Sequence, residues 1–413
     1  MPPLSDSRTA WRLVALLWVA FLINYVDRQI VFSMFPVLRS ELHFSETLLG
    51  VIGSLFLWVY SSSMLLTGRL ADVIRRDRIV VGSLVLWSVA TLGSGLSRTA
   101  TEFLFWRALV GVTEALYLPA AFGLIANFHS GRTRSRALAI HGTAQFTGIV
   151  AGGWAGGWMA DHHLWRYGFA ALALIGVLYA VFLARAFRSF PAMPAVERSP
   201  ESSSLEILTS RCYLALTASF VAFNGLLWMF YAWLPDWIRD HHSLTMAQSG
   251  FAATFFTQAS TAVGVLIGGF LGDRLAARVA AGRIYVAAAG LALSAPFAWL
   301  TFATTSLAVA RASSALFGLL SGLLIANLFA SAYDVISERN YGAGAGVLNF
   351  CGGLSAGTAV FLAGAWKQTV GIPALVAGIS LTAFCLAFVL IVVGTLRFEP
   401  EHGRARAHAG RIA

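Results

Sequence analysis

Apolar residues run through this chain in stretches of about twenty, separated by short polar breaks that often contain arginine. An α-helix rises about 1.5 Å per residue, so about 20 apolar residues are enough to cross the hydrocarbon core of a bilayer. The pattern predicts an all-α membrane protein with twelve transmembrane helices. The predicted segments are 11–35, 48–68, 79–97, 102–128, 136–159, 167–187, 212–235, 248–272, 283–302, 304–332, 343–366 and 373–396.

Composition agrees with this class of protein. Of 413 residues, 58% are hydrophobic and 12% are charged, and a soluble chain this apolar would aggregate. The first segment starts close to Met1, contains charges and has no small-residue cleavage site, so we expect a retained helix and not a signal peptide. No nucleophile–base pair, metal-ligand spacing or phosphate loop indicates an enzyme, and we expect no metal ion and no cofactor.

Basic residues indicate the orientation in the membrane. Most of the 29 lysines and arginines fall in alternate loops, among them Arg75, Arg76 and Arg78 after the second segment. Cytoplasmic loops carry such an excess, and an even number of segments then places both termini in the cytoplasm. The net charge of +10 belongs to this inner rim, where arginines contact anionic lipids, and does not imply nucleic-acid binding. The arginine-rich, lysine-poor composition is typical of GC-rich bacteria, so we expect a bacterial inner membrane.

The longest polar interruption, rich in proline and serine, covers residues 187–204 and separates six segments from six. It predicts an N-terminal six-helix bundle (1–188), a cytoplasmic linker (189–211) and a C-terminal six-helix bundle with a short cytoplasmic tail (212–413). The two halves carry similar motifs at corresponding positions. The motif "GRLAD" at Gly68–Asp72 lies at the end of the second predicted segment, and "GFLGD" at Gly269–Asp273 lies at the end of the eighth. We therefore expect two pseudo-symmetric bundles that arose by internal duplication.

Five charged residues lie well inside predicted helices, away from the helix ends: Asp27, Arg28, Arg107, Glu114 and Arg311. A charge at the bilayer centre costs about 3 kcal/mol on insertion scales, so each needs a partner or a water-filled cavity. Arg107 and Glu114 share one helix face at i and i+7, and the Arg28 side chain leans toward the membrane middle. These charges predict either a functional site or a buried ion-pair network that only fixes helix packing. For Arg311 we favour the packing role.

The residue types suggest how such a site would work. A carboxyl group away from water holds its proton more tightly, and a nearby arginine has the opposite effect, so Asp27 and Glu114 are candidate proton-coupling acids. The planar guanidinium of Arg28 suits bidentate binding of a carboxylate. Neutral polar side chains for hydroxyl groups are available at Tyr60 and Gln145, and at Asn349 in the second half.

The loop "GRLADVIRRDR" after the second segment resembles the loop motif of the major facilitator superfamily, whose 6+6 layout matches the whole chain. Gly68 would let helices approach, and we expect Asp72 and Arg76 to form a conformational latch through ion pairs or a helix N-terminus. The family commonly has a second glycine where this sequence has Arg75, which predicts a differently shaped latch. A basic loop that only sets topology is the alternative.

Within that superfamily, "INYVDRQIVFSM", "RALVGVTEALYLPA", "YAWLPDWI" and "GAGAGVLNFCGG" are similar to the anion:cation symporter family of hexuronate, sugar-acid and sialic-acid carriers. The resemblance implies proton-coupled symport of a small organic anion by alternating access. It implies that Asp27 and Glu114 take up protons, that Arg107 tunes them, and that Arg28 binds the substrate carboxylate. It also places Tyr60, Gln145 and Asn349 at substrate-contact positions.

Several alternatives keep the same fold. "NYVDR" also resembles spinster-like lipid transporters, so an exporter or lipid-type carrier is the second hypothesis. A non-transporting membrane sensor is the third, and the expected lack of an appended cytoplasmic domain disfavours it. Sodium is the alternative coupling ion. We expect a monomer whose partners are the substrate, protons and membrane lipids.

Overall fold

The computed structural model describes residues 7–70, 74–191, 207–337 and 340–409, and every regular element within these ranges is a helix. Contacts divide the chain into two compact units. Unit 1 comprises Met1–Arg198 and Ser243–Phe251, and unit 2 comprises Ser199–His242 and Ala252–Ala413.

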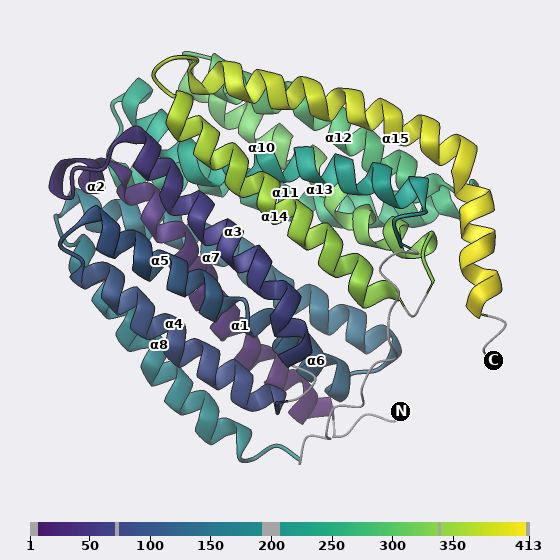
Figure 1. Cartoon of the computed structure of the whole chain (residues 1–413), viewed down its shortest axis with the longest axis horizontal. Coiled ribbons are helices and arrows are strands. Elements are labelled where there is room, and N and C mark those ends of the chain that lie inside the picture. The colour runs from purple at the N-terminus through teal and green to yellow at the C-terminus, as the bar shows by residue number, and fades with distance from the viewer. Residues whose placement is uncertain (1–6, 71–73, 192–206, 338–339, 410–413) are drawn as a thin grey trace. The chain divides into compact units, whose positions relative to one another are not determined.

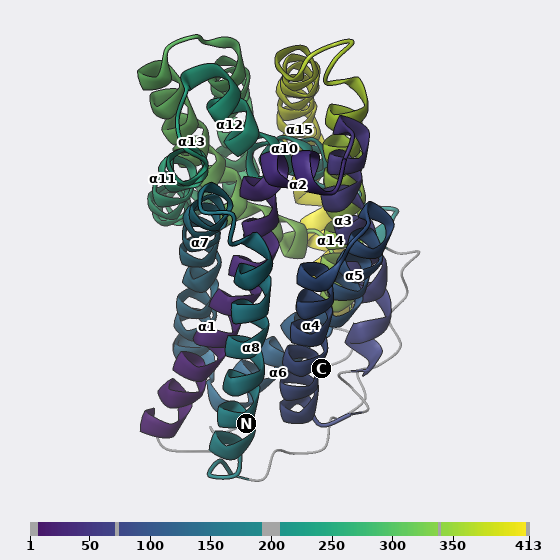
Figure 2. The ribbon, with the colours of Figure 1, turned by 90° about the vertical axis from the view of Figure 1, so that its left-hand side faces the viewer.

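Unit 1 is a helical bundle in which α1 packs along α7, α4 along α8, and α5 against both α3 and α4. Figures 1 and 2 both show α4 beside α8. Its helices are α1 (Ser7–Ile30), η1 (Val31–Met34), α2 (Phe35–Glu41), α3 (Glu46–Leu70), α4 (Arg76–Leu96), α5 (Ala100–Glu114), α6 (Tyr117–Phe128), α7 (Gly131–Asp161) and α8 (Trp165–Phe187).

Unit 2 is a second bundle, in which α12 packs against α13 and α15, and α10 packs against α14 and α15. Its helices are α10 (Arg211–His242), most of α11 (Met246–Ala276), α12 (Gly282–Ala303), α13 (Leu307–Asp334), α14 (Tyr341–Trp366) and α15 (Ile372–Ala409). Figure 1 shows α15 bending near its end, where Pro400 lies inside the helix.

Eleven helical segments of the described chain are long and apolar enough to cross a membrane. The remaining predicted segment corresponds to α7, a 31-residue helix rich in glycine and hydroxyl side chains, which lower its hydropathy. Large apolar side chains are exposed on the outer faces of both units, where lipid chains would cover them. Examples are Leu86, Phe105, Leu178, Phe182, Leu266, Phe270, Leu381 and Phe388.

Two predicted spans are broken where the sequence suggested continuous helices. The first contains a 3-10 turn before Pro36, and the fourth is interrupted between Glu114 and Tyr117, ahead of Pro119. Proline has no N–H to offer the carbonyl four residues earlier, and its ring crowds that carbonyl. For Pro119 the affected carbonyl is that of Ala115, the residue that follows the last residue of α5.

Small residues on α7 allow it to approach α1 closely. A Cβ added at Gly152 would lie 2.8 Å from the carbonyl oxygen of Val26, and one at Gly148 would lie 2.7 Å from Cβ of Tyr25. Close helix crossings of this kind depend on glycine in membrane bundles. The α7 helix therefore covers the face of α1 that carries Leu22 and Val26, and leaves the opposite face free to meet other helices.

The C-terminal end of α15 extends beyond the predicted segment 373–396 because it is anchored by polar contacts. Glu401 accepts hydrogen bonds from Ser210 Oγ at 2.7 Å and from the backbone N–H groups of Arg211 and Cys212 at 3.1 Å each. A carboxylate at this position stabilises the N-terminus of α10, where backbone N–H groups lack helical partners.

Candidate functional site

Four charged side chains of unit 1 meet inside its bundle, two from α1 and two from α5. Asp27 and Arg28 are adjacent near the end of α1, and Arg107 and Glu114 lie about two turns apart on α5. Asp27 and Glu114 are 0% exposed, Arg107 is 1% exposed and Arg28 is 6% exposed. Charges at this depth require partners, and each of the four has one.

Asp27 is paired with Arg107. The Arg107 Nη1 group lies 3.1 Å from Oδ1 of Asp27, and the hydroxyl of Thr91 on α4 donates a hydrogen bond to the other oxygen, Oδ2. Both carboxylate oxygens are therefore bound by donors from two different helices. This arrangement suits an ionised aspartate, which only accepts hydrogen bonds.

Glu114 is paired with Arg28. The Nε group of Arg28 donates to Oε2 of Glu114 at 2.6 Å, while Oε1 of Glu114 is buried without a hydrogen-bond partner. The guanidinium carbon of Arg28 lies 4.3 Å from the ring centroid of Tyr60 and 4.8 Å from that of Tyr25. Aromatic faces stabilise the cation and shield it from water.

One phenylalanine of α3 touches both arginines. The ring centroid of Phe56 lies 5.2 Å from the guanidinium carbon of Arg28 and 5.6 Å from that of Arg107. Phe56 also stacks on Tyr60, one turn further along α3. The two ion pairs thus share an aromatic neighbour and form one connected cluster.

The break between α5 and α6 places Glu114 at a helix end. Glu114 is the last residue of α5, and the N–H of Ala115 still closes the final turn onto Gly111. Directly beyond the break, the hydroxyl of Tyr117 donates to the carbonyl of Leu17 on α1 at 2.6 Å. The segment that carries Glu114 is therefore fixed to α1 on both sides of the carboxyl group.

The other predicted site residues are distributed over both units. Gln145 is half-buried on α7, and Asn349 is exposed on α14 of unit 2, with its amide N–H bound to the carbonyl of its own helix at Ala345, 2.8 Å away. Arg311 on α13 lies with its guanidinium carbon 5.7 Å from the ring centroid of Phe256. These observations assign none of the three a role.

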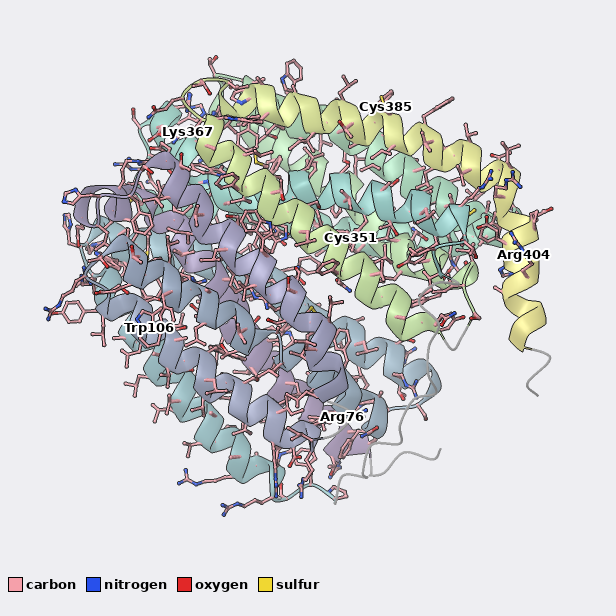
Figure 3. The ribbon with its side chains drawn as sticks, in the orientation of Figure 1. Arg76, Trp106, Cys351, Lys367, Cys385 and Arg404 are labelled. Carbon is pink, nitrogen blue, oxygen red and sulfur yellow. The ribbon has the colours of Figure 1, made fainter. Side chains whose placement is uncertain are left out.

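The predicted latch is only partly visible. Gly68 lies in α3, and Asp72 falls outside the described residues. Arg76, at the start of α4 and labelled in Figure 3, donates from Nη1 to the carbonyl of Gly123 at 3.3 Å and to Oδ1 of Asn127 at 3.4 Å. Arg76 therefore ties the start of α4 to α6.

Sequence reasoning missed Thr91, Phe56 and Tyr25. For Phe56 and Tyr25 a signal existed, because they lie one turn from Tyr60 and Arg28 on the same helix faces. Thr91 gave no signal, since hydroxyl side chains in apolar helices usually bond to their own backbone.

The sequence model of the Major Facilitator Superfamily matches residues 17–360. An MFS-type efflux pump of Mycolicibacterium smegmatis is 28% identical over 275 residues, which cover 66% of this chain and 64% of the pump, so the chain spans less than two thirds of that relative. The hexuronate transporter of Bacillus subtilis is 25% identical over 354 residues, which cover 82% of this chain and 83% of that protein.

A solved structure with the same fold is a bacterial homologue of the human lysosomal transporter Spinster, in an inward-facing and unoccupied conformation. It has a TM-score of 0.76 and 17% sequence identity, and the match covers 97% of this chain and 98% of that one. The matched proteins are transporters and not enzymes. With its apolar helices and a family match over most of its length, this multi-pass membrane protein belongs to the Major Facilitator Superfamily of transporters.

Proposed function

We propose that the protein is a secondary active transporter that imports a small hydroxylated organic anion together with protons, by alternating access. The observation that carries this proposal is the buried pair of Arg28 and Glu114, in which an anion-binding group is held by an acid. Of the four charged groups, Arg28 keeps the largest exposed fraction, at 6%, so it is the group best placed to meet a solute.

Charge balance explains why a proton would accompany the anion. The two arginines and two carboxylates of the cluster sum to zero when all are ionised. A carboxylate substrate that bound Arg28 would leave one uncompensated negative charge in a buried site, which costs several kcal/mol. One proton on Glu114 restores neutrality and releases Arg28 for bidentate binding of the substrate.

Asp27 is the second proton site in this proposal, and Arg107 sets how readily it accepts a proton. Their 3.1 Å contact holds Asp27 against Arg107, and movement of α5 relative to α1 would weaken that hold. Tyr60, beside Arg28, contacts the substrate directly, and Gln145 and Asn349 supply hydrogen bonds to its hydroxyl groups.

The remaining assignments concern location and gating. The arginine distribution supports a bacterial inner membrane with both termini in the cytoplasm. Gly68, Asp72 and Arg76 form the latch between conformations, and the contacts of Arg76 with α6 support its part in this role.

Uptake into proteoliposomes tests the proposal. Radiolabelled hexuronates, aldonates and aldarates are offered with an inward proton gradient, and at least one acid should accumulate. Arg28→Ala should lower uptake about 10- to 100-fold, because it removes charge-assisted hydrogen bonds of about 1.5–3 kcal/mol. Arg28→Lys should recover only part of it, since an ammonium group lacks the planar fork.

Arg239→Ala is the matched control, because Arg239 lies near the end of α10 with 37% of its side chain exposed and contacts Asp240 at 3.7 Å. It should leave uptake unchanged. The proposal fails if no acid is taken up, or if Arg28→Ala transports as well as the unaltered protein.

Export is the second candidate function. The efflux pump of Mycolicibacterium smegmatis and the spinster-like fold support it. Inside-out vesicles decide between the two directions. An exporter would accumulate its substrate in such vesicles when their interior is acidified, whereas the proposed symporter would release preloaded anion.

A further inference from the structure

An asparagine of α1 has a buried and unpartnered side chain beside the charged cluster. Asn24 is 0% exposed, and neither its Nδ2 nor its Oδ1 atom has a hydrogen-bond partner among the residues that the structure describes. Leaving a buried amide unpaired costs free energy, and most buried side-chain amides are paired. A buried, unpaired amide has two possible explanations. It is a packing defect, or it forms its hydrogen bonds in another state of the protein.

The position of Asn24 favours the second explanation. At about 100° per residue, Asn24 lies about 60° from Asp27 and about 40° from Arg28 around the helix axis, so it faces between them. The opposite face of α1 is occupied by α7, which crosses at Leu22 and Val26. Asn24 therefore points toward the ion pairs.

The depth of Asn24 also matches that of Glu114. Helical side chains lean toward the N-terminus, so the Arg28 side chain covers the turn that begins at Asn24. Glu114 binds Arg28 at Nε, partway along this side chain. The carboxyl group of Glu114 thus lies over the same turn, and its Oε1 atom is also without a partner.

The chemistry of the two groups is complementary in one protonation state. An ionised glutamate only accepts hydrogen bonds and is best matched by Arg28. A protonated glutamate has one O–H donor and one carbonyl acceptor, and a primary amide offers the reverse pair. Protonated Glu114 and Asn24 can therefore satisfy each other through two hydrogen bonds.

We propose that Asn24 is the positioning residue that receives Glu114 when Glu114 is protonated, so that the carboxyl group moves from Arg28 to Asn24 and leaves Arg28 free for the substrate. The proposal rests on the proposed function, because it gives Glu114 its role in proton coupling. It gives the carboxyl group of Glu114 two alternative partners. Arg28 binds the ionised form, and Asn24 binds the protonated form.

Other charged and titratable groups act on Glu114 from the surrounding helices. They are Arg28, Asp27 and Tyr25 on α1 and Arg107 on α5 itself, while Tyr60 on α3 contacts Arg28. From α4, which also packs on α5, Thr91 at this level is neutral. A test of the role of Asn24 must leave all of these side chains unchanged and must report on the protonation of Glu114 itself.

Infrared titration of the purified protein without substrate meets this need. The carbonyl stretching band of protonated carboxyl groups is followed against pH, and Glu114→Gln identifies the contribution of Glu114. In Asn24→Leu, this band should move to higher wavenumber, because its hydrogen bonds are lost. Its titration midpoint should fall by about 1.5 pH units, since two neutral hydrogen bonds of about 1 kcal/mol each no longer favour the protonated form.

Stability measurements separate this role from simple packing. Asn24→Leu should be at least as thermostable as the unaltered protein at neutral pH, because it replaces an unpaired amide with an apolar side chain of similar volume. The control is Asn327→Leu on α13, where Nδ2 donates to Gly268 O at 2.8 Å and Leu323 O at 2.9 Å. That variant should be less thermostable. Asn24→Ala provides a second variant for the infrared measurement.

An unchanged Glu114 band and midpoint in both Asn24 variants would overturn the proposal. If proton-driven uptake is observed and the band does not respond, the partner exchange is wrong and the proposed function stands. If the band responds as expected and no proton-driven uptake occurs, Asn24 is the partner of protonated Glu114 and the transport assignment is wrong.

Discussion

The ion pair of Asp27 and Arg107 offers a quantitative test of the site. In Arg107→Met, Asp27 keeps the hydroxyl of Thr91 but loses its counter-charge in a site where it is 0% exposed. Removing one partner of a buried pair typically costs about 3–5 kcal/mol, because the remaining charge is uncompensated. For a unit of this size, this corresponds to a fall in melting temperature on the order of 10 °C.

A double-mutant cycle isolates the pair. Asp27→Asn should cost less than Arg107→Met, since the amide oxygen still accepts from Arg107 and the guanidinium keeps its contact with Phe56. The double variant Asp27→Asn/Arg107→Met buries neither charge, so it should be more stable than Arg107→Met alone. We expect a coupling free energy of about 2–4 kcal/mol.

The assay is thermal and denaturant unfolding in detergent, followed by tryptophan fluorescence. The partly exposed pair of Arg39 and Glu46, joined at 2.6 Å with side chains 31% and 16% exposed, is the control, and its cycle should give no more than about 1 kcal/mol. Additive effects within about 0.5 kcal/mol at Asp27 and Arg107 would refute the buried ion pair.

Two further predictions concern packing and capping. Gly156→Val should lower the stability of the unit by about 1–3 kcal/mol in the same unfolding assay, because a side chain there meets the carbonyl of Ile30, whereas Gly142→Ala, with nothing within 4 Å, should have little effect. Glu401→Ala should cost about 1 kcal/mol by uncapping α10 and should expose the end of α15 to limited proteolysis, while the exposed Glu399→Gln should leave the cleavage pattern unchanged.

The pattern of apolar runs was sufficient to predict that the chain is a membrane protein and where most of its helices lie. The runs of apolar residues predicted α4, α8 and α12 to within about three residues, because a helix must remain apolar for as long as it is in contact with lipid. The breaks at Glu114–Tyr117 and before Pro36 were missed, although the prolines that cause them were visible in the sequence.

The sequence alone could not predict which acid pairs with which arginine. The sequence indicated that Asp27, Arg28, Arg107 and Glu114 needed partners, but which acid meets which base depends on the rotation of α5 against α1. That rotation is set by packing against Phe56 and Thr91, which belong to two further helices. For the same reason the sequence could not show that Asn24 lies buried and unpaired.

The shared contact of Phe56 with both arginines has an evolutionary consequence. One uncharged ring contacts the arginines of both ion pairs, at 5.2 Å and 5.6 Å from the guanidinium carbons. A substitution of Phe56 would change the interaction free energy of both ion pairs at once and would leave all four charges in place. Lineages can therefore diversify the energetics of the cluster through a hydrophobic residue, without passing through an intermediate that carries a lone buried charge.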